Sequence, residues 1–140
     1  MLVSKKNILN IIPQRAPFVM IDKLLVANEV EGFKTSFQVQ QDNVFIENNI
    51  VSEGALIENV AQTCAAGFGY VSQQKGNNEP QLGFIGAVSK LKVFGVAKSN
   101  DELITKVSVL STFDRVSLIQ GEVECDGEIL LECQMKIVIT

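Results

Sequence analysis

One carboxylate stands alone in the middle of the chain. Glu58 is the only charged residue between Gly54 and Gln74, in a stretch that is otherwise rich in apolar and small residues. A carboxylate in such surroundings costs folding free energy unless it is hydrogen-bonded, ion-paired or hydrated. Burial would raise its pKa toward neutrality, whereas a nearby helix N-terminus would lower it. A carboxyl group poised in this way can act as a general acid or base, but a glutamate that reaches solvent or pairs with a cation fits the same pattern.

Groups on either side of Glu58 extend this candidate site. Gln62 lies one helical turn later and is predicted to hydrogen-bond the Glu58 carboxylate, although a polar filler residue fits equally well. The backbone N–H groups of Gly54 and Ala55, about one turn earlier, are predicted to be unpaired at a helix start. Such donors can bind a carbonyl oxygen and stabilise an enolate-like charge. We therefore expect Glu58 and Gln62 to be catalytic, with Gly54 and Ala55 binding substrate.

The composition limits which group could assist Glu58. The chain contains no histidine, so a Ser-His-Asp triad, a Cys-His dyad and any site with a His metal ligand are excluded within it. Acid–base chemistry then rests on Asp, Glu, Tyr, Cys or Lys, or on a partner chain. Asp42 and Glu47 could supply a second carboxylate, but residues of this kind usually form a solvated loop with Asx turns.

The cysteines predict neither a disulfide framework nor a metal site. Their number is odd and no pair has C-x-x-C spacing, so we interpret Cys64, Cys125 and Cys133 as small buried hydrophobic residues. No metal and no cofactor is expected.

Charge and hydropathy exclude two further classes of protein. The net charge of −4 argues against nucleic-acid binding, because phosphate contacts need a clustered basic surface. Residues 54–74 are the only candidate for a membrane span, and their several polar side chains are not typical of a bilayer helix. The N-terminal residues lack the apolar core of a signal peptide. We expect a cytoplasmic protein with no nucleic-acid or membrane partner.

The element that must hold Glu58 is a long helix over about 52–74. Ser52 is a suitable N-cap, and apolar residues recur at helical spacing after it. At 1.5 Å per residue the helix would be about 34 Å long. Its three glycines, Gly54, Gly67 and Gly69, are poor helix formers and indicate that another backbone approaches the helix closely. Its apolar character on most sides predicts burial.

Strands are predicted before and after this helix, with a short helix over 4–11 and a loop over 75–80. The expected strand ranges are 18–25, 33–39, 83–96, 102–112, 115–125 and 128–139. Asp126-Gly127, between the last two, is typical of a type I′ hairpin turn. Four consecutive strands argue against a doubly wound α/β fold. The pattern predicts an α+β hot-dog fold, a curved antiparallel sheet wrapped around one long central helix, as a single domain over residues 1–140.

Four blocks of the chain follow the motif order of one known family. After Ile8-Leu9, residues 13–23 read PQRAPFVMIDK and are similar to an I-L-P-H-R-x-P-F-L-L-V-D-R start. Residues 56–62, LIENVAQ, are similar to an L-I-x-E-A-x-A-Q helix. Residues 86–94 and the ending from Asp126 are weaker matches. Together, over nearly the whole chain, these blocks resemble the bacterial 3-hydroxyacyl-(acyl-carrier-protein) dehydratases of the hot-dog superfamily.

The chain departs from that family where the family places its catalytic histidine. A G-H-F-P-G-x-P-x-x-P-G stretch precedes the family's helix, whereas residues 45–54 here contain no His and no Pro. Gln14 replaces the His of the first block. Glu58 matches a catalytic residue of the family, and Gln62 matches the glutamine that follows it there. Gly54 matches the family's oxyanion-binding glycine only if a gap is placed in the alignment to bring the two together. The chain is more similar to divergent dehydratase-like proteins of polyene pigment clusters, some of which are thought to work in pairs.

The resemblance implies a dehydratase-like protein that acts on acyl thioesters, carried by acyl carrier protein or CoA, in fatty-acid or polyene biosynthesis. Glu58 would be its general acid/base. It implies a homodimer, or a heterodimer with another hot-dog subunit, whose sheets join edge to edge and hide exposed strand edges. Because the histidine is missing, three alternatives stay open: a non-catalytic acyl-thioester-binding partner subunit of a dehydratase pair, a hot-dog thioesterase in which Glu58 activates water, and an inert assembly module.

Overall fold

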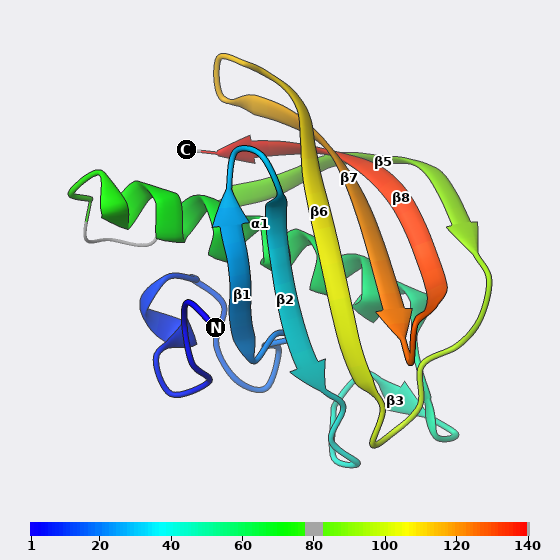
Figure 1. The fold of residues 1–140 in the computed structure, drawn as a ribbon. Helices are drawn as coiled ribbons and strands as arrows, with labels where there is room; N and C mark the ends of the chain where they lie inside the picture. Colours follow the sequence, from blue (N-terminus) through cyan, green and yellow to red (C-terminus); the bar gives the residue numbers. More distant parts are fainter. Residues whose placement is uncertain (78–82, 140) are drawn as a thin grey trace.

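One antiparallel sheet wraps around one long helix (Figure 1) in the computed structural model, which describes residues 1–77 and 83–139. The sheet has six strands in the order β1-β2-β6-β7-β8-β5, and β3 and β4 form a separate two-stranded ribbon. The elements in chain order are η1 Ile8–Asn10, β1 Lys23–Asn28, β2 Gly32–Gln38, β3 Ile46–Glu47, β4 Ile50–Val51, α1 Glu53–Gln74, β5 Gly83–Val93, β6 Glu102–Phe113, β7 Val116–Cys125 and β8 Glu128–Ile139. This is the arrangement predicted from the order of elements.

Helix α1 matches the predicted range to within about one residue. Ser52 caps it as expected, because its Oγ accepts a hydrogen bond from the Ala55 N–H at 3.2 Å. A Cβ atom added to Gly69 would lie 2.3 Å from the Ile11 carbonyl oxygen, so the N-terminal backbone approaches the helix as closely as its glycines predict. Along the part of the chain that the structure describes, no helix is long and apolar enough to cross a membrane.

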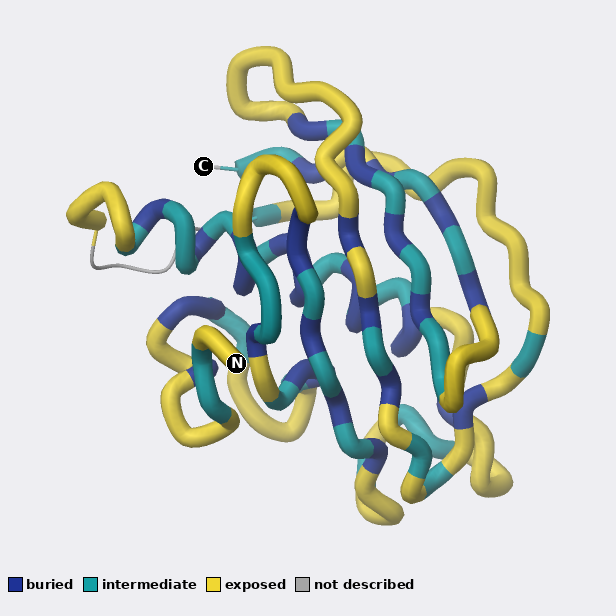
Figure 2. Tube along the Cα trace, viewed as in Figure 1, coloured by how far each residue is buried: buried dark blue, intermediate teal, exposed yellow. Residues whose placement is uncertain are grey.

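The core lies between α1 and the sheet, and Figure 2 shows buried residues alternating along the central strands. On β2, Phe33 and Phe37 are buried, whereas Lys34 between them is only half-buried. This alternation follows the predicted period of two. A Cβ atom added to Gly121 on β7 would lie 2.4 Å from Val60 Cγ1 on α1, so a side chain at this point would collide with the helix.

Two predictions near the N-terminus are wrong. The strand predicted over 18–25 begins only at Lys23, because the backbone N–H and C=O of Met20 bond to helix side chains rather than to a neighbouring strand. The helix predicted over 4–11 is reduced to the single turn η1, and Asn7 at its start makes no side-chain capping bond.

The turns and the register show further details. Asp126 and Gly127, with φ of 51° and 82°, form the predicted type I′ turn between β7 and β8. A register shift between these strands breaks the alternation of β8, so that Ile129 is exposed although Leu131 is buried. The predicted loop over 75–80 lies partly outside the described residues, which stop at 77 and resume at 83.

The β3–β4 ribbon occupies a segment that we expected to be a loop. Its turn is made by Asn48 and Asn49, whose φ values of 53° and 65° fall in the left-handed region that asparagine tolerates. Just before it, Asn43 Oδ1 accepts a hydrogen bond from the Phe45 N–H at 2.9 Å, which is the Asx turn expected for this segment.

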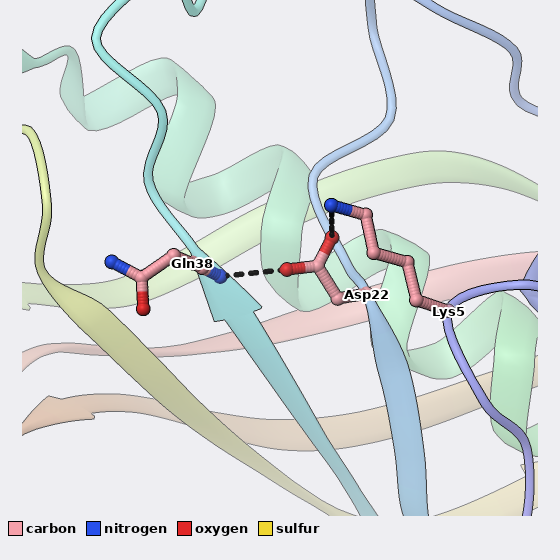
Figure 3. Close-up of polar contacts among 3 residues, drawn as sticks. All are labelled: Lys5, Asp22 and Gln38. Atoms are coloured by element: carbon pink, nitrogen blue, oxygen red, sulfur yellow. Dashed lines mark hydrogen bonds and ion pairs between the residues drawn. The ribbon is translucent and has the colours of Figure 1, made fainter.

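Asp22 joins three separate pieces of the chain near the start of β1 (Figure 3). Its carboxylate accepts a hydrogen bond from the Gln38 backbone N–H at 2.8 Å and lies 3.8 Å from Lys5 Nζ. Its own N–H donates to the Ser36 carbonyl oxygen at 2.8 Å. These contacts fix where the chain enters β1, and with it the segment that leads there from residue 13.

Candidate active site

Glu58 and Gln62 lie on consecutive turns of α1 and are hydrogen-bonded, as predicted. Gln62 Nε2 donates to Glu58 Oε1 at 3.0 Å and also to the Phe18 carbonyl oxygen at 2.9 Å. Gln62 Oε1 accepts a hydrogen bond from the Met20 N–H at 2.6 Å. The Gln62 side chain is fully buried, whereas Glu58 is half-buried.

These three bonds fix the orientation of the Gln62 amide. Because the Met20 N–H requires an acceptor, the amide oxygen points at Met20 and the amide nitrogen points at Glu58. The Glu58 carboxylate therefore accepts a hydrogen bond from a donor that is itself held by backbone groups. This arrangement fixes the direction in which the Glu58 carboxylate points, whereas a catalytic role for either residue stays a prediction.

An apolar cavity of about 210 Å³ lies beside Glu58. Its walls are α1, the start of β5, the end of β8 and the segment before β1. Among the described residues of its lining, Glu58 is the only titratable one and Gln14 the only other with a polar side chain. The apolar lining consists of Ala61, Ala65, Phe68, Gly83, Phe84, Ile85, Ile137 and Ile139. A carboxylate in this position can meet the polar part of a ligand whose remainder is apolar.

Gly54 and Ala55 lie in the first turn of α1 and are not part of this lining. The Ala55 N–H is bonded to Ser52 Oγ, so the N-cap already satisfies a donor that we predicted to be unpaired. Gly54 is exposed, and a Cβ atom added to it would have no atom within 4 Å. There is thus open space for a ligand group beside Gly54, and its role as a carbonyl donor stays a prediction.

Asp42 and Glu47, the candidates for a second carboxylate, are both exposed and neither lines the Glu58 cavity. Asp42 borders a different hollow, between the N-terminal segment and the end of β2. Glu47 lies in the β3–β4 ribbon. The structure therefore does not bring either of them into the cavity with Glu58.

Sequence reasoning missed the contribution of Asn59. Its Nδ2 donates to the Met20 carbonyl oxygen at 2.7 Å, and its Oδ1 accepts a hydrogen bond from the Thr105 hydroxyl. One turn later the Thr63 and Thr35 hydroxyls bond to each other at 2.7 Å. The signal was the polar pair Asn59 and Thr63 at i, i+4 in an otherwise apolar helix, which marks a second polar contact line beside that of Glu58 and Gln62.

The cysteines are free thiols, and two of the three are buried as predicted. Burial raises the pKa of the Cys133 thiol to about 11. It also raises the pKa of Cys64, where the nearby Cys133 adds to the effect. The half-buried Cys125 has a raised pKa as well, first through burial and then through Asp101. Within residues 1–77 and 83–139 no three His, Cys, Asp or Glu residues gather as metal ligands would.

Strand β5 is the last strand of the sheet, and its first residues form one wall of the cavity. Every residue of β5 after Gly83 is exposed, as the outer trace in Figure 2 shows. The exposed residues include large apolar ones, such as Phe84, which is 56% exposed, and Leu91, which is 41% exposed. Among the residues that the structure describes, none pairs with the outer edge of β5, so the cavity lies beside an open sheet edge with exposed apolar side chains.

Known proteins show the same fold and a shared sequence pattern. The 3-hydroxyacyl-[acyl-carrier-protein] dehydratase FabZ of Caldicellulosiruptor bescii is 29% identical over 135 residues, covering 89% of this chain and 94% of the relative. The structure of the dehydratase heterocomplex ApeI:P from Xenorhabdus doucetiae matches with a TM-score of 0.86 at 15% identity, covering 95% of this chain and 90% of that one. A hypothetical thioesterase with coenzyme A from Streptococcus pneumoniae matches with a TM-score of 0.65 at 11% identity, covering 84% of each chain.

The structural matches confirm the α+β hot-dog fold. At identities of 15% or less, these structural matches show the fold alone. Membership of a family is shown by the sequence instead. A family profile described as "ApeP-like: ApeP dehydratase" matches residues 6–139, which include Glu58, Gln62 and the segment that Gln62 holds. The chain therefore belongs to the ApeP-like dehydratase family, a divergent branch of hot-dog dehydratases.

Proposed function

We propose that this protein is a subunit of a 3-hydroxyacyl-[acyl-carrier-protein] dehydratase in fatty-acid or polyene biosynthesis, with Glu58 as general acid/base. The observation that carries the proposal is the position of Glu58, held by Gln62 at the wall of an apolar cavity of about 210 Å³. The cavity suits an acyl chain, and the carboxylate suits the transfer of a proton. Membership of a dehydratase family and the FabZ relatives support the same reaction.

The reaction needs two proton transfers. A base removes a proton from C2 of the acyl chain, the electrons of that C–H bond form the C2–C3 double bond, and the C3 hydroxyl leaves as water after it gains a proton from an acid. We propose that Glu58 carries one of these protons. Donors must also polarise the thioester carbonyl, and the Gly54 N–H is our candidate, because the Ala55 N–H already bonds to Ser52.

The second proton-transfer group is proposed to come from another hot-dog subunit. Glu58 is the only titratable residue in the described lining of the cavity, and both Asp42 and Glu47 lie elsewhere. A second copy of this chain would bring no histidine, because the chain has none. We therefore favour a heterodimer with a His-bearing subunit over a homodimer. That the X. doucetiae relative is a dehydratase heterocomplex supports this choice.

We place this second subunit along β5. An unpaired edge strand readily accepts another strand, and addition here would continue the sheet and cover apolar residues such as Phe84 and Leu91. The added subunit would also stand next to the cavity, because the first residues of β5 line it. The proposed contact therefore both covers the edge and brings a second set of side chains near Glu58.

The test is dehydration of a 3-hydroxyacyl-carrier-protein by the chain alone and by the chain mixed with a co-encoded, His-bearing hot-dog subunit, with free thiol monitored in parallel. We expect enoyl product only from the mixture. Glu58→Gln keeps the shape of the side chain but cannot exchange its proton, so we expect a loss of about 10²–10⁴-fold. Glu53→Gln is the matched control, because Glu53 is an exposed carboxylate in the first turn of the same helix and does not line the cavity.

The alternatives predict different results in this assay. Release of thiol that depends on Glu58 would replace the dehydratase proposal by a thioesterase. Full activity of the Glu58→Gln mixture would make this chain a non-catalytic binding subunit of the pair. Product from the chain alone would refute the need for a partner while keeping the role of Glu58.

A further inference from the structure

Two cavities follow one another along one side of α1. The cavity beside Glu58 has a volume of about 210 Å³, and a second one farther along the helix has a volume of about 490 Å³. The helix residues that line them, in chain order, are Glu58, Ala61, Ala65, Phe68, Val71 and Lys75. Their spacing of three or four residues places them on one side of the helix. Among the described residues, only Phe68 belongs to both linings.

The sheet places the two cavities at the same end of its strands. The strand residues of the first cavity lie at the start of β5 and the end of β8, and those of the second lie at the β1–β2 turn and toward the end of β6. Because neighbouring strands are antiparallel, these strand ends meet at one end of the sheet, as Figure 1 shows. Both cavities therefore lie between α1 and this end of the sheet, with Phe68 at their boundary.

The ring of Phe68 is held at this boundary by a second aromatic residue. Phe68 is half-buried, and its ring meets that of Phe33 edge-on, with centroids 5.0 Å apart. Phe33 is buried on β2, and its ring lies so close to α1 that a Cβ atom added to Gly67 would collide with it. Phe33 lines the second cavity but not the first. Phe68 thus packs against a fixed ring on the side of the second cavity.

The residues before Phe68 leave room that its ring then closes. Ala61 and Ala65 are small, so they leave space on this side of α1, whereas Phe68 fills the next position of the same row. From Glu58 to Phe68 the helix rises by roughly 15 Å. An acyl chain whose reacting carbons meet Glu58 would lie along the two alanines, and its far end would meet the ring of Phe68.

We propose that Phe68 is the partition that sets the longest acyl chain this protein accepts, by closing the Glu58 cavity off from the second cavity. This inference rests on the proposed function and adds a specificity-determining residue to it. Chains that end before Phe68 are buried along their whole length. The additional carbons of a longer chain meet the ring and gain no burial, although an apolar space of larger volume lies directly behind it.

The experiment measures by calorimetry how affinity depends on chain length, with the chain alone and with its co-encoded hot-dog subunit. The second subunit alone is the blank. The probes are the pantetheine amides of hexanoic, octanoic, decanoic, dodecanoic and tetradecanoic acid. The amide replaces the thioester so that no thioesterase activity consumes the probe. Each methylene group that is taken out of water strengthens binding by about fourfold, so the probe at which affinity stops rising marks the end of the accessible space.

For the unmodified protein we expect affinity to rise up to one probe and to change by less than about twofold for each longer one. In Phe68→Ala the rise should continue, so that the next longer probe binds at least about fivefold more tightly than to the unmodified protein. Phe68→Leu should extend the limit by a smaller factor and decides the question if the alanine variant does not fold. Val71→Ala is the matched control, because it enlarges the second cavity while Phe68 stays in place, and it should keep the original limit.

The outcomes separate this inference from the proposed function. The role of Phe68 is overturned if affinity rises through all five probes in the unmodified protein, or if every Phe68 variant that folds keeps the original limit. An equal extension in Val71→Ala also overturns it, since general loosening would then explain the effect. Each of these results leaves the dehydratase proposal standing. Failure to bind any probe, alone or with the second subunit, overturns the acyl-ligand class itself and with it both proposals.

Discussion

Replacing Gln62 by leucine tests how the candidate site is held together. Gln62 is fully buried and makes three hydrogen bonds, to the Met20 N–H, to the Phe18 carbonyl oxygen and to Glu58 Oε1. Leucine has a similar volume but offers neither donor nor acceptor. The substitution therefore removes the polar contacts while keeping most of the packing.

The expected loss of stability follows from the partners that remain. The Met20 N–H is buried and would be left without an acceptor, which costs about 1–3 kcal/mol. The Phe18 carbonyl oxygen is only partly buried and can turn to water, so its loss costs about 0.5–1.5 kcal/mol. Glu58 is half-buried and can also be solvated. Burial of the leucine offsets part of this cost, and we expect a net loss of about 1–3 kcal/mol in the free energy of unfolding.

Urea unfolding at one fixed protein concentration measures this loss, since any association would make stability depend on concentration. Gln73→Leu is the matched control, because Gln73 lies on the same helix and makes one exposed bond, to the Asn10 carbonyl oxygen at 2.9 Å. We expect that variant to lose less than about 1 kcal/mol. Equal losses in the two variants would refute the conclusion that Gln62 holds the segment before β1.

Gln62→Glu separates the hydrogen bond to Glu58 from the packing of the side chain. The new carboxylate would still accept the bond from Met20 but would lie beside Glu58, where the Gln62 nitrogen now lies 3.0 Å from Glu58 Oε1. Repulsion would raise the pKa of the pair in the folded state above its unfolded value. The folded protein would then hold the extra proton longer, so the stability of the variant is closest to that of the unmodified protein near pH 4 and falls as the pH rises through the raised folded pKa. A pH-independent difference between the two proteins would contradict this.

Two further predictions concern packing and thiol chemistry. Gly69→Ala should destabilise the protein by about 1–3 kcal/mol, because its Cβ would lie 2.3 Å from a backbone carbonyl oxygen, whereas Gly54→Ala, with open space around it, should stabilise α1 by about 0.5–1 kcal/mol. Urea unfolding measures both changes in stability, and a change of the same sign in the two variants would contradict the packing described around these glycines. A thiol reagent at pH 8 should label only Cys125 in the native protein, and slowly because its pKa is raised, since burial raises the pKa of Cys64 and of Cys133 and shields both. All three should react in urea, and mass spectrometry counts the labels.

Local patterns were sufficient for α1 and for most of the sheet, because the spacing of apolar residues reflects which face is buried. The alternation at Phe33 and Phe37 reproduces the burial of β2, and the Ser52 cap marks the start of α1 within about one residue. The exception on β8 has a physical cause. The register shift before the β7–β8 turn reverses the side on which Ile129 lies, and nothing in the spacing of apolar residues shows that shift.

The segment before β1 shows where local patterns fail. Residues 18–22, FVMID, have the composition of a strand, but both backbone groups of Met20 bond to side chains of α1. The partners, Gln62 and Asn59, follow 42 and 39 residues later in the chain. A rule that considers only neighbouring residues does not include these partners, and it therefore predicts a strand where residues 18–22 form none.

In the candidate site, too, some contacts are local in sequence and others depend on the fold. The bond between Glu58 and Gln62 was predictable because an i, i+4 pair on one helix is a local feature. That Gln14 reaches the same cavity is a consequence of the fold, as is the exposure of Asp42 and Glu47, which are much closer to Glu58 in the sequence. Proximity along the chain therefore does not predict which side chains share the cavity with Glu58, because the arrangement of the segment before β1 decides it.

Under the proposed function, the position of the cavity accounts for the lack of a histidine in this chain. One wall of the cavity is the start of β5, the strand at the end of the sheet, and the same strand exposes Phe84 and Leu91. Left alone, this chain presents to water both an open strand edge and an apolar surface, which are unfavourable together. The subunit proposed to pair along β5 would remove both at once and would bring its own side chains to the cavity that holds Glu58. Assembly and completion of the site would then depend on one contact, and loss of that contact is expected to abolish both.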